Sequence, residues 1–203
     1  MLRKYIIIMN VTEIMLRYIV SFLAVLLLII LGVVLFSGGT KKEVPKPTST
    51  TKVLALPDYA TTSANASITI DGRINGEDTH RAIRITVSNN ERSIDILQGY
   101  SGNVIDSHRY TNSVDAFNVF LRALDNQRFL LARKGVKNTD DRGQCPLGNR
   151  FIFKLTQEGK DLSRLWSSTC NGVGTFAGKS ANTQELFKKQ IPDYDKITAQ
   201  VRL

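Results

Sequence analysis

The feature that most constrains this chain is a run of nineteen residues, Tyr18 to Phe36, which holds no charged side chain, no proline and no amide side chain. A helix rises about 1.5 Å per residue, so this run would cover roughly 28 Å, close to the ~30 Å hydrocarbon thickness of a bilayer. A helix also pairs its own backbone polar groups, as a bilayer requires. Residues 18–36 are therefore predicted to form a transmembrane helix.

A secretory signal peptide is the alternative interpretation of this run, because small residues at Ser37, Gly38 and Gly39 could permit cleavage. The apolar region of such a peptide usually spans about 7 to 15 residues, and this run is longer. An uncleaved anchor is therefore favoured, with residues 1–17 as a short N-terminal segment.

Residues 37–56 follow the apolar run and combine glycines, a Thr/Ser cluster and two prolines, Pro45 and Pro47, without apolar periodicity. Prolines favour the extended polyproline II conformation, at about 3 Å per residue. We interpret this segment as a linker. Residues 57–203 then have the usual size of one domain.

The orientation of the anchor depends on its flanking charges and on the cysteines. Basic residues stand on both sides of the apolar run, so the positive-inside comparison is nearly balanced. Cys145 and Cys170 are the only cysteines, and an even pair in a modest domain indicates a disulfide and an oxidising compartment. The sequence therefore predicts a single-pass cell-membrane protein with residues 1–17 in the cytoplasm and residues 57–203 outside.

The net charge of +9 is concentrated near the predicted membrane. Residues 1–56 hold seven basic and two acidic side chains, whereas residues 57–203 hold twenty and sixteen. Charges beside the anchor would meet anionic lipid headgroups. Basic residues in the domain are spread singly and do not gather beside aromatic residues, so no nucleic-acid partner is predicted.

Period-two alternation of apolar residues marks the first half of the domain. The predicted strands cover residues 67–74, 81–87, 93–97 and 104–110. Turn-forming residues at 88–91 predict a hairpin between the second and third strands.

The period then changes to three and four over residues 114–125, where Ser113 is a suitable N-cap. This pattern predicts a helix that packs on the sheet. Residues 129–132 resume an apolar, strand-like run, and a polar loop follows at 135–148.

The C-terminal part of the domain predicts a second hairpin and a short helix. Strands at 150–156 and 162–169 would be joined at Glu158-Gly159, and a capping-box pattern from Asn182 would begin a helix that ends before Pro192. The whole order predicts an α+β domain with a largely antiparallel sheet covered on one face.

A bridge between Cys145 and Cys170 would close a 26-residue loop across the base of the second hairpin. Such a crosslink contributes about 3 kcal/mol to the free energy of unfolding in the chain-entropy account. No Cys-x-x-Cys motif is present, which favours a structural role over a redox role.

A glycine-rich segment at 172–180 ends in Gly-Lys-Ser and invites comparison with a phosphate-binding loop. The spacing differs, because Val173 stands where the Walker A motif needs its first glycine. We interpret the glycines as residues that permit a tight path. Lys179 and nearby backbone amides remain a candidate for binding a small anion at a helix N-terminus.

Four titratable residues are candidates for acid–base chemistry: His80, His108, Asp140 and Asp141. Both histidines are predicted to be solvent-facing strand residues that could meet across the sheet. They lack a recognisable ligand spacing, so no metal and no cofactor is predicted. Acidic loop residues beside a glycine are usually turn formers.

Trp166 is the only tryptophan, and period two places it on the same strand face as Arg164. Packing in the core is the favoured interpretation. The alternative is an exposed ring that anchors a glycan or a peptide together with Arg164, because aromatic and arginine side chains dominate binding energy.

These observations predict an envelope protein whose extracytoplasmic domain binds a partner protein or a cell-wall polymer, without catalysis. A membrane-tethered hydrolase acting on envelope material is the alternative, with the two histidines and two aspartates above as its candidates. A pilin-like assembly subunit is the second alternative, but no glycine precedes the apolar run in the way that pilin processing requires. Oligomeric state is left open.

Overall fold

The computed structural model describes residues 21–23, 26–27, 54–136, 139–170 and 174–203. It divides into two units, Met1–Thr51 and Lys52–Leu203. In the first unit the described residues 21–23 and 26–27 are helical, and the rest of the predicted transmembrane run lies outside the described residues. Among the residues that the structure describes, no helix combines the length and the apolar character needed to traverse a membrane.

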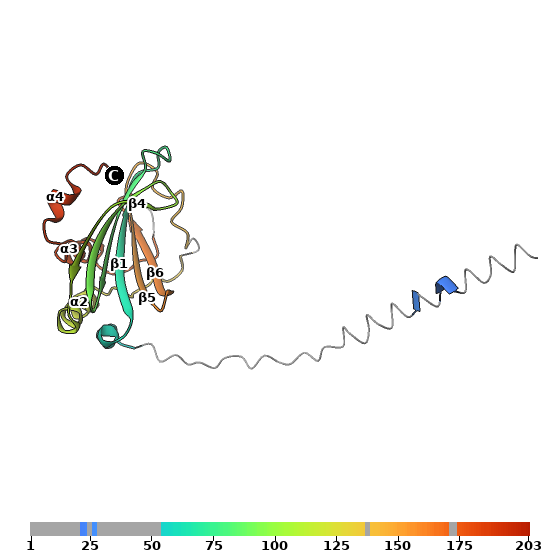
Figure 1. Ribbon diagram of the computed structural model, residues 1–203, viewed down its shortest axis with the longest axis horizontal. Helices are drawn as coiled ribbons and strands as arrows, with labels where there is room; N and C mark the ends of the chain where they lie inside the picture. The colour runs from blue at the N-terminus through green and yellow to red at the C-terminus, as the bar shows by residue number, and fades with distance from the viewer. Residues whose placement is uncertain (1–20, 24–25, 28–53, 137–138, 171–173) are drawn as a thin grey trace, which may run out of the picture. The chain divides into compact units, whose positions relative to one another are not determined.

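The second unit contains one six-stranded antiparallel sheet (Figure 1), in which the strands follow the order β4-β3-β2-β1-β5-β6. The first strand is therefore central, with a three-stranded meander on one side and a hairpin on the other. The predicted α+β class with an antiparallel sheet is confirmed. The strands are β1 (Ala64–Asp71), β2 (Arg81–Ser88), β3 (Glu91–Gln98), β4 (Asn103–Thr111), β5 (Arg150–Gln157) and β6 (Lys160–Ser168).

Both predicted hairpins are present, β2–β3 and β5–β6. In the second, Glu158 and Gly159 form a two-residue loop between the paired Gln157 and Lys160. Their φ angles are 51° and 74°. Positive φ at both central residues is the backbone of a type I′ turn, whose twist suits the flanking strands.

Helix α2 (Val114–Asn126) forms where the sequence predicts it, and the Ser113 hydroxyl accepts a hydrogen bond from the Ala116 backbone N–H at 3.2 Å. Val114 is exposed, but the rest of the apolar stripe is buried. The buried side chains of α2 are Phe117, Phe120, Leu121 and Leu124.

Helix α3 (Ser180–Lys188) begins two residues before the predicted start at Asn182. Thr183 is fully buried, and its hydroxyl donates to the Lys179 carbonyl at 2.9 Å, which extends the first turn backwards. Two further short elements escaped prediction, the 3-10 helix η1 (Leu56–Thr61) and helix α4 (Tyr194–Thr198).

Three details of the predicted organisation are wrong. Strand β1 ends at Asp71, and Ile74 lies in the following loop, where its N–H donates to the Pro146 carbonyl and not to a neighbouring strand. The side chain of Ile74 is 38% exposed. Of the predicted strand-like run at 129–132, residues 129–130 lie in a turn and Ala132 forms an isolated bridge with Phe176. Leu56, assigned to the linker, is buried in the core.

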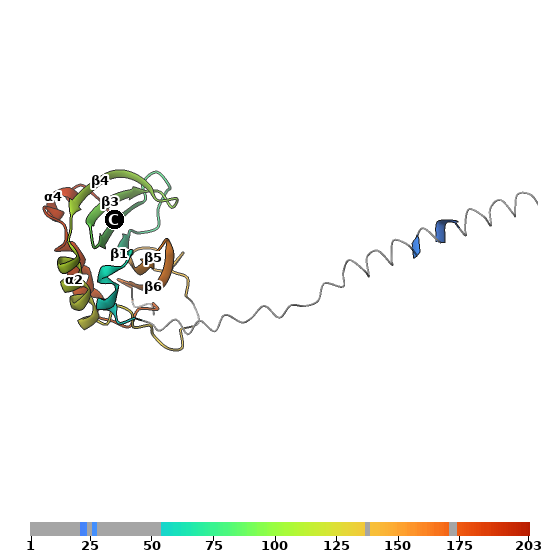
Figure 2. The ribbon, with the colours of Figure 1, turned by 60° about the horizontal axis from the view of Figure 1, so that its bottom comes forward.

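Helix α2 lies on one side of the sheet (Figure 2). The hydrophobic core lies on that face of the sheet and includes buried side chains of the strands and of η1, α2 and α3. The inward residues of the central strand are Ile68 and Ile70, and they alternate with polar residues that point to the opposite side. We call that opposite side the open face. On β1 the open face carries Ser67, Thr69 and Asp71.

The packing of α2 yields a matched pair of substitutions. Leu121→Ala removes a fully buried side chain, and we expect the free energy of unfolding to fall by about 2 to 5 kcal/mol. Val119→Ala, on the same helix and 68% exposed, is expected to change it by less than about 0.5 kcal/mol. Urea unfolding of the full chain in non-ionic detergent, followed by Trp166 fluorescence, measures both. Equal effects of the two variants would contradict this packing.

Candidate functional site

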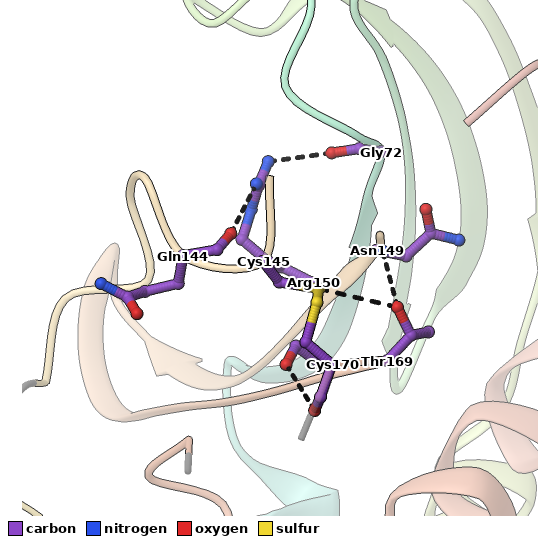
Figure 3. Close-up of a disulfide and its surroundings, with 8 residues drawn as sticks. Gly72, Gln144, Cys145, Asn149, Arg150, Thr169 and Cys170 are labelled. Carbon is purple, nitrogen blue, oxygen red and sulfur yellow. Dashed lines mark hydrogen bonds between the residues drawn. A yellow bond between two sulfur atoms is a disulfide. The ribbon is translucent and has the colours of Figure 1, made fainter. Parts of the chain in front are cut away.

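A buried ion pair joins two strands at one end of the open face. Asp71, the last residue of β1, lies opposite Arg150, the first residue of β5. The Asp71 carboxylate accepts hydrogen bonds from Nε of Arg150 at 2.9 Å and from Nη2. The Arg150 side chain is only 3% exposed, and it also donates to the carbonyls of Gln144 at 3.1 Å and Gly72 at 2.9 Å (Figure 3). One guanidinium therefore fixes the strands and two loops.

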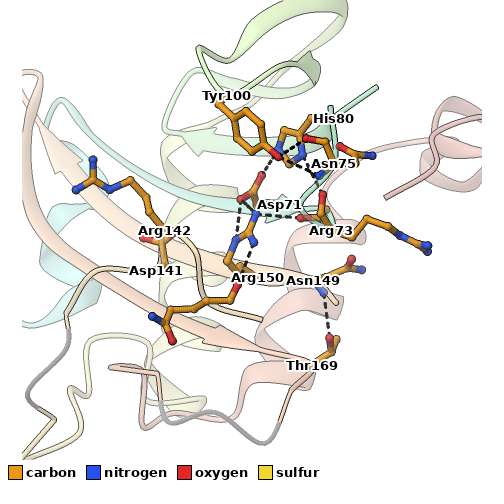
Figure 4. A network of polar contacts seen from close by, with 12 residues as sticks. Asp71, Arg73, Asn75, His80, Tyr100, Asp141, Arg142, Asn149, Arg150 and Thr169 are labelled. Atoms are coloured by element: carbon orange, nitrogen blue, oxygen red, sulfur yellow. Dashed lines mark hydrogen bonds and ion pairs between the residues drawn. The ribbon is translucent and has the colours of Figure 1, made fainter. Parts of the chain in front are cut away.

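His80 belongs to the same network (Figure 4). Its Nε2 lies 2.8 Å from Asp71 Oδ1, and its Nδ1 lies 3.1 Å from the Arg73 carbonyl oxygen. The side chain is 2% exposed, so the prediction of a solvent-facing strand residue is wrong. The physical reason is the tight turn before β2, where the His80 N–H bonds the Gly76 carbonyl at 2.8 Å and the ring turns inward.

Tyr100 covers the ring of His80 and forms the rim of the site. The two rings stack with centroids 4.2 Å apart and an interplanar angle of 17°. The Tyr100 hydroxyl donates to the Asn75 carbonyl at 2.8 Å and accepts from the Asn75 N–H at 3.0 Å. The Glu77 carboxylate accepts from the Tyr100 N–H at 3.0 Å. The tyrosine is thus fixed at both ends, yet it remains 52% exposed.

The predicted disulfide is present, and Cys145 directly follows Gln144, whose carbonyl accepts a hydrogen bond from the Arg150 guanidinium. The Cα atoms of Cys145 and Cys170 lie 5.6 Å apart, and the bridge joins the loop before β5 to the end of β6 (Figure 3). Beside it, the Thr169 hydroxyl accepts from the Asn149 N–H at 3.0 Å.

Two acidic residues of this loop are held by arginines. Asp141 is buried and pairs with Arg164 of β6. Asp140 receives hydrogen bonds from the side chain and backbone of Arg142, and these lower the pKa of Asp140 from 3.8 to about 2. The same contact raises the pKa of Arg142. Both carboxylates are therefore engaged by guanidinium groups.

These side chains line a cavity of about 330 Å³ on the open face, which we call the open-face pocket. Of the residues proposed from the sequence, the structure brings His80, Asp141 and Arg164 together there. Asp140 does not line the pocket, but it pairs with Arg142, which does. The polar or aromatic side chains of the lining are those of Thr69, Asp71, His80, Tyr100, Asp141, Arg142, Lys154 and Arg164.

His108 lies elsewhere, in β4, where it pairs with Asp106 at 3.2 Å and stands opposite Ile94. The expected meeting of His108 with His80 does not occur, because the latter precedes β2 at the far end of the sheet. Within the described ranges, no group of three or more His, Cys, Asp or Glu side chains is placed to hold a metal ion.

Trp166 is 2% exposed, so its burial is as expected and the exposed-anchor alternative does not hold. Its register, through Ile152 to Thr69, puts it on the open face and outside the hydrophobic core. Its indole N–H donates to the Thr139 carbonyl at 3.2 Å. Lys179 is exposed at the start of α3 and does not line the open-face pocket. A Cβ on Gly174 or Gly178 would collide with backbone carbonyls, so these glycines do permit a tight path.

Sequence reasoning missed Asp71, Arg150 and Tyr100. Asp71 lies within the strand predicted at 67–74 and Arg150 begins the strand predicted at 150–156, and only the pairing of β1 with β5, almost eighty residues apart, makes them partners. A local signal did exist for Tyr100, since an aromatic residue beside the Ser101-Gly102 turn is exposed unless something covers it.

The titratable groups of the open-face pocket are already engaged with protein partners. A general base needs a free lone pair within reach of a substrate proton. Both ring nitrogens of His80 already face oxygen acceptors, and the Asp71 carboxylate is occupied by Arg150. The carboxylates of Asp140 and Asp141 are likewise engaged. What remains accessible is an aromatic ring among charged donors and acceptors.

No protein-family model matches this sequence, and a search of curated proteins finds no significant match.

The buried pair makes a direct prediction for stability. Asp71→Asn keeps the shape of the side chain but leaves the Arg150 charge buried without its counterion, and we expect a loss of about 3 to 5 kcal/mol in the free energy of unfolding. Asp161→Asn removes a half-exposed partner of Lys154 and is expected to cost about 1 kcal/mol or less. Urea unfolding of the full chain tests the pair. Similar losses in both variants would show that the Arg150 site is not a buried charge centre.

Proposed function

We propose that this protein is a single-pass membrane protein of the cell envelope that displays a binding domain outside the cytoplasmic membrane. The uncharged run at 18–36 supports the anchor. The Cys145–Cys170 disulfide supports an oxidising location for residues 57–203. Residues 1–17 would then lie in the cytoplasm, and residues 37–56 would separate the domain from the bilayer.

Limited proteolysis tests this topology. Trypsin added to protoplasts or spheroplasts is expected to cut within residues 37–56, which contain four lysines, and to release the C-terminal domain. A cytoplasmic protein in the same sample should stay intact. A domain that trypsin reaches only after lysis, or full-length chain recovered in the aqueous fraction, would contradict the proposal.

We further propose that the open-face pocket binds a hydroxyl-rich polymer of the cell envelope. The observation that carries this proposal is Tyr100, an exposed ring that is stacked on His80 and fixed through its hydroxyl. A rigid aromatic side chain offers a large contact area without further loss of conformational entropy on binding. Aromatic anchors of this kind dominate the energy of binding sites.

The charged lining of the pocket suits hydroxyl groups, which both donate and accept hydrogen bonds. Arg142, Lys154 and Arg164 supply donors, and the carboxylates of Asp71 and Asp141 supply acceptors. Because each charge already has a partner of opposite sign, a neutral polar ligand can bind without an uncompensated charge. A folded protein partner would need a larger and more apolar surface.

Hydrolysis is the less favoured function, since the histidine and the aspartates of the pocket are engaged with one another and with arginines. In a binding site, His80 would hold Tyr100 in place, and the aspartates would hold Arg142 and Arg164 in place. A pilin-like assembly role gains no support from the pocket.

Substitution of Tyr100 tests the proposed site. Tyr100→Ala is expected to weaken the binding of soluble cell-wall fragments to the full chain at least tenfold, as titration calorimetry measures. Tyr100→Phe keeps the ring but loses the bonds to Asn75, so an intermediate loss is expected. Val119→Ala, on α2, is the control and should bind normally.

Two results would refute this assignment. One is unchanged affinity in Tyr100→Ala while its far-ultraviolet dichroism stays normal. The other is turnover of the fragments by the unaltered chain that disappears in Asp141→Asn, which would establish the hydrolase instead.

A further inference from the structure

A second cavity, of about 570 Å³, lies beside the loop between β1 and β2, and we call it the three-arginine pocket. Arg73 and Arg81 reach it from the loop and from the start of β2, and Arg202 reaches it from the C-terminal segment. Its other lining residues are Asn75, Thr79, Gln200 and Leu203. No acidic side chain is among these described residues.

Two of the guanidinium groups are oriented by backbone carbonyls. Arg81 Nη1 donates to the carbonyls of Asp78 at 2.8 Å and His80 at 2.9 Å. Arg73 Nε donates to the Leu203 backbone oxygen at 3.3 Å, and its guanidinium points away from the Asp71–His80 network (Figure 4). The terminal nitrogens of Arg73 have no hydrogen-bond partner in the part of the chain that the structure describes.

Gly72 permits the close approach that forms this pocket. A Cβ at this position would stand 3.0 Å from Cα of Leu203 and nearer still, at 2.7 Å, to the Arg81 carbonyl oxygen. The C-terminal segment can therefore lie against the loop only because residue 72 has no side chain. This contact places Arg202 beside the arginines of the loop.

The three arginines differ from those of the open face in their counterions. Each open-face arginine of the network pairs with a side-chain carboxylate, whereas none of the three forms an ion pair with the side-chain carboxylate of a described residue. Guanidinium groups around one cavity without such partners create a local positive potential that attracts anions. The open-face pairs are Arg84–Asp95, Arg142–Asp140, Arg150–Asp71 and Arg164–Asp141.

We propose that the three-arginine pocket binds a phosphate group. One guanidinium suffices for the two oxygens of a carboxylate, but three guanidinium groups match the charge and the several oxygens of a phosphate. The side-chain amides of Asn75 and Gln200 add neutral donors at the rim. The cavity is larger than one phosphate, so a phosphate ester fits as well as the free ion.

This site is separate from the proposed hydroxyl-binding function, and failure of one leaves the other intact. The two pockets share no lining residue, although the Tyr100 hydroxyl at the rim of one is bonded to the backbone of Asn75, which lines the other. Tyr100→Ala and the arginine variants therefore report on different ligands.

Titration of the full chain in non-ionic detergent with inorganic phosphate, at ionic strength held constant with sodium chloride, tests the proposal. Saturable binding is expected, and the double variant Arg73→Gln with Arg202→Gln should weaken it at least tenfold. Arg81 is left unchanged because it also holds the loop. The matched control, Arg92→Gln with Arg122→Gln, removes the same charge from sites outside the pocket and should bind phosphate as before.

Competition then identifies the source of the phosphate. Short-chain phosphatidylglycerol that displaces phosphate better than glycerol phosphate would assign a lipid headgroup, whereas equal displacement would assign a soluble phosphate ester. Absence of saturable phosphate binding would overturn the proposal, as would equal weakening in the control double variant. Loss of phosphate binding in the arginine variant alone, with cell-wall fragments still bound, would support it.

Discussion

The buried charge of Arg150 is the constraint on which the rest of the site depends. A guanidinium removed from water must find carboxylate and carbonyl partners, because an uncompensated buried charge is very costly. Its partners come from β1, from the loop after β1 and from the loop before β5. Asp71 then has one oxygen left, which positions His80, and the histidine in turn supports Tyr100. The shape of the rim therefore follows from one charge.

The disulfide and the Arg150 network restrain the same loop in different ways. The bridge from Cys145 to Cys170 ties the loop covalently to the end of β6, and it stabilises chiefly by limiting the unfolded chain. The hydrogen bond from Arg150 to the Gln144 carbonyl acts only in the folded chain and sets the local backbone position. Together they hold Asp141 where it can pair with Arg164, so that a polar loop presents ordered charges.

Patterns that are local in the sequence predicted much of the fold. Alternation identified the strands, the turn at Glu158-Gly159 identified a hairpin, and Ser113 identified a helix start, because each depends on neighbours within a few residues. The site was less accessible, since the partnership of Asp71 with Arg150 depends on strand pairing across the chain. Of the candidates, His80, Asp141 and Arg164 converge, but the inward turn of the His80 ring depends on a turn that the pattern does not encode.

His80 connects the two proposed sites, because different parts of the residue serve each of them. Its ring lines the open-face pocket and supports Tyr100, while its backbone carbonyl accepts from Arg81 at 2.9 Å in the three-arginine pocket. The same carbonyl also accepts from the Gly99 N–H at 3.1 Å. A change that moved this residue would therefore displace the aromatic rim and a guanidinium together. The polar network thus fixes the spacing between the open-face pocket and the three-arginine pocket.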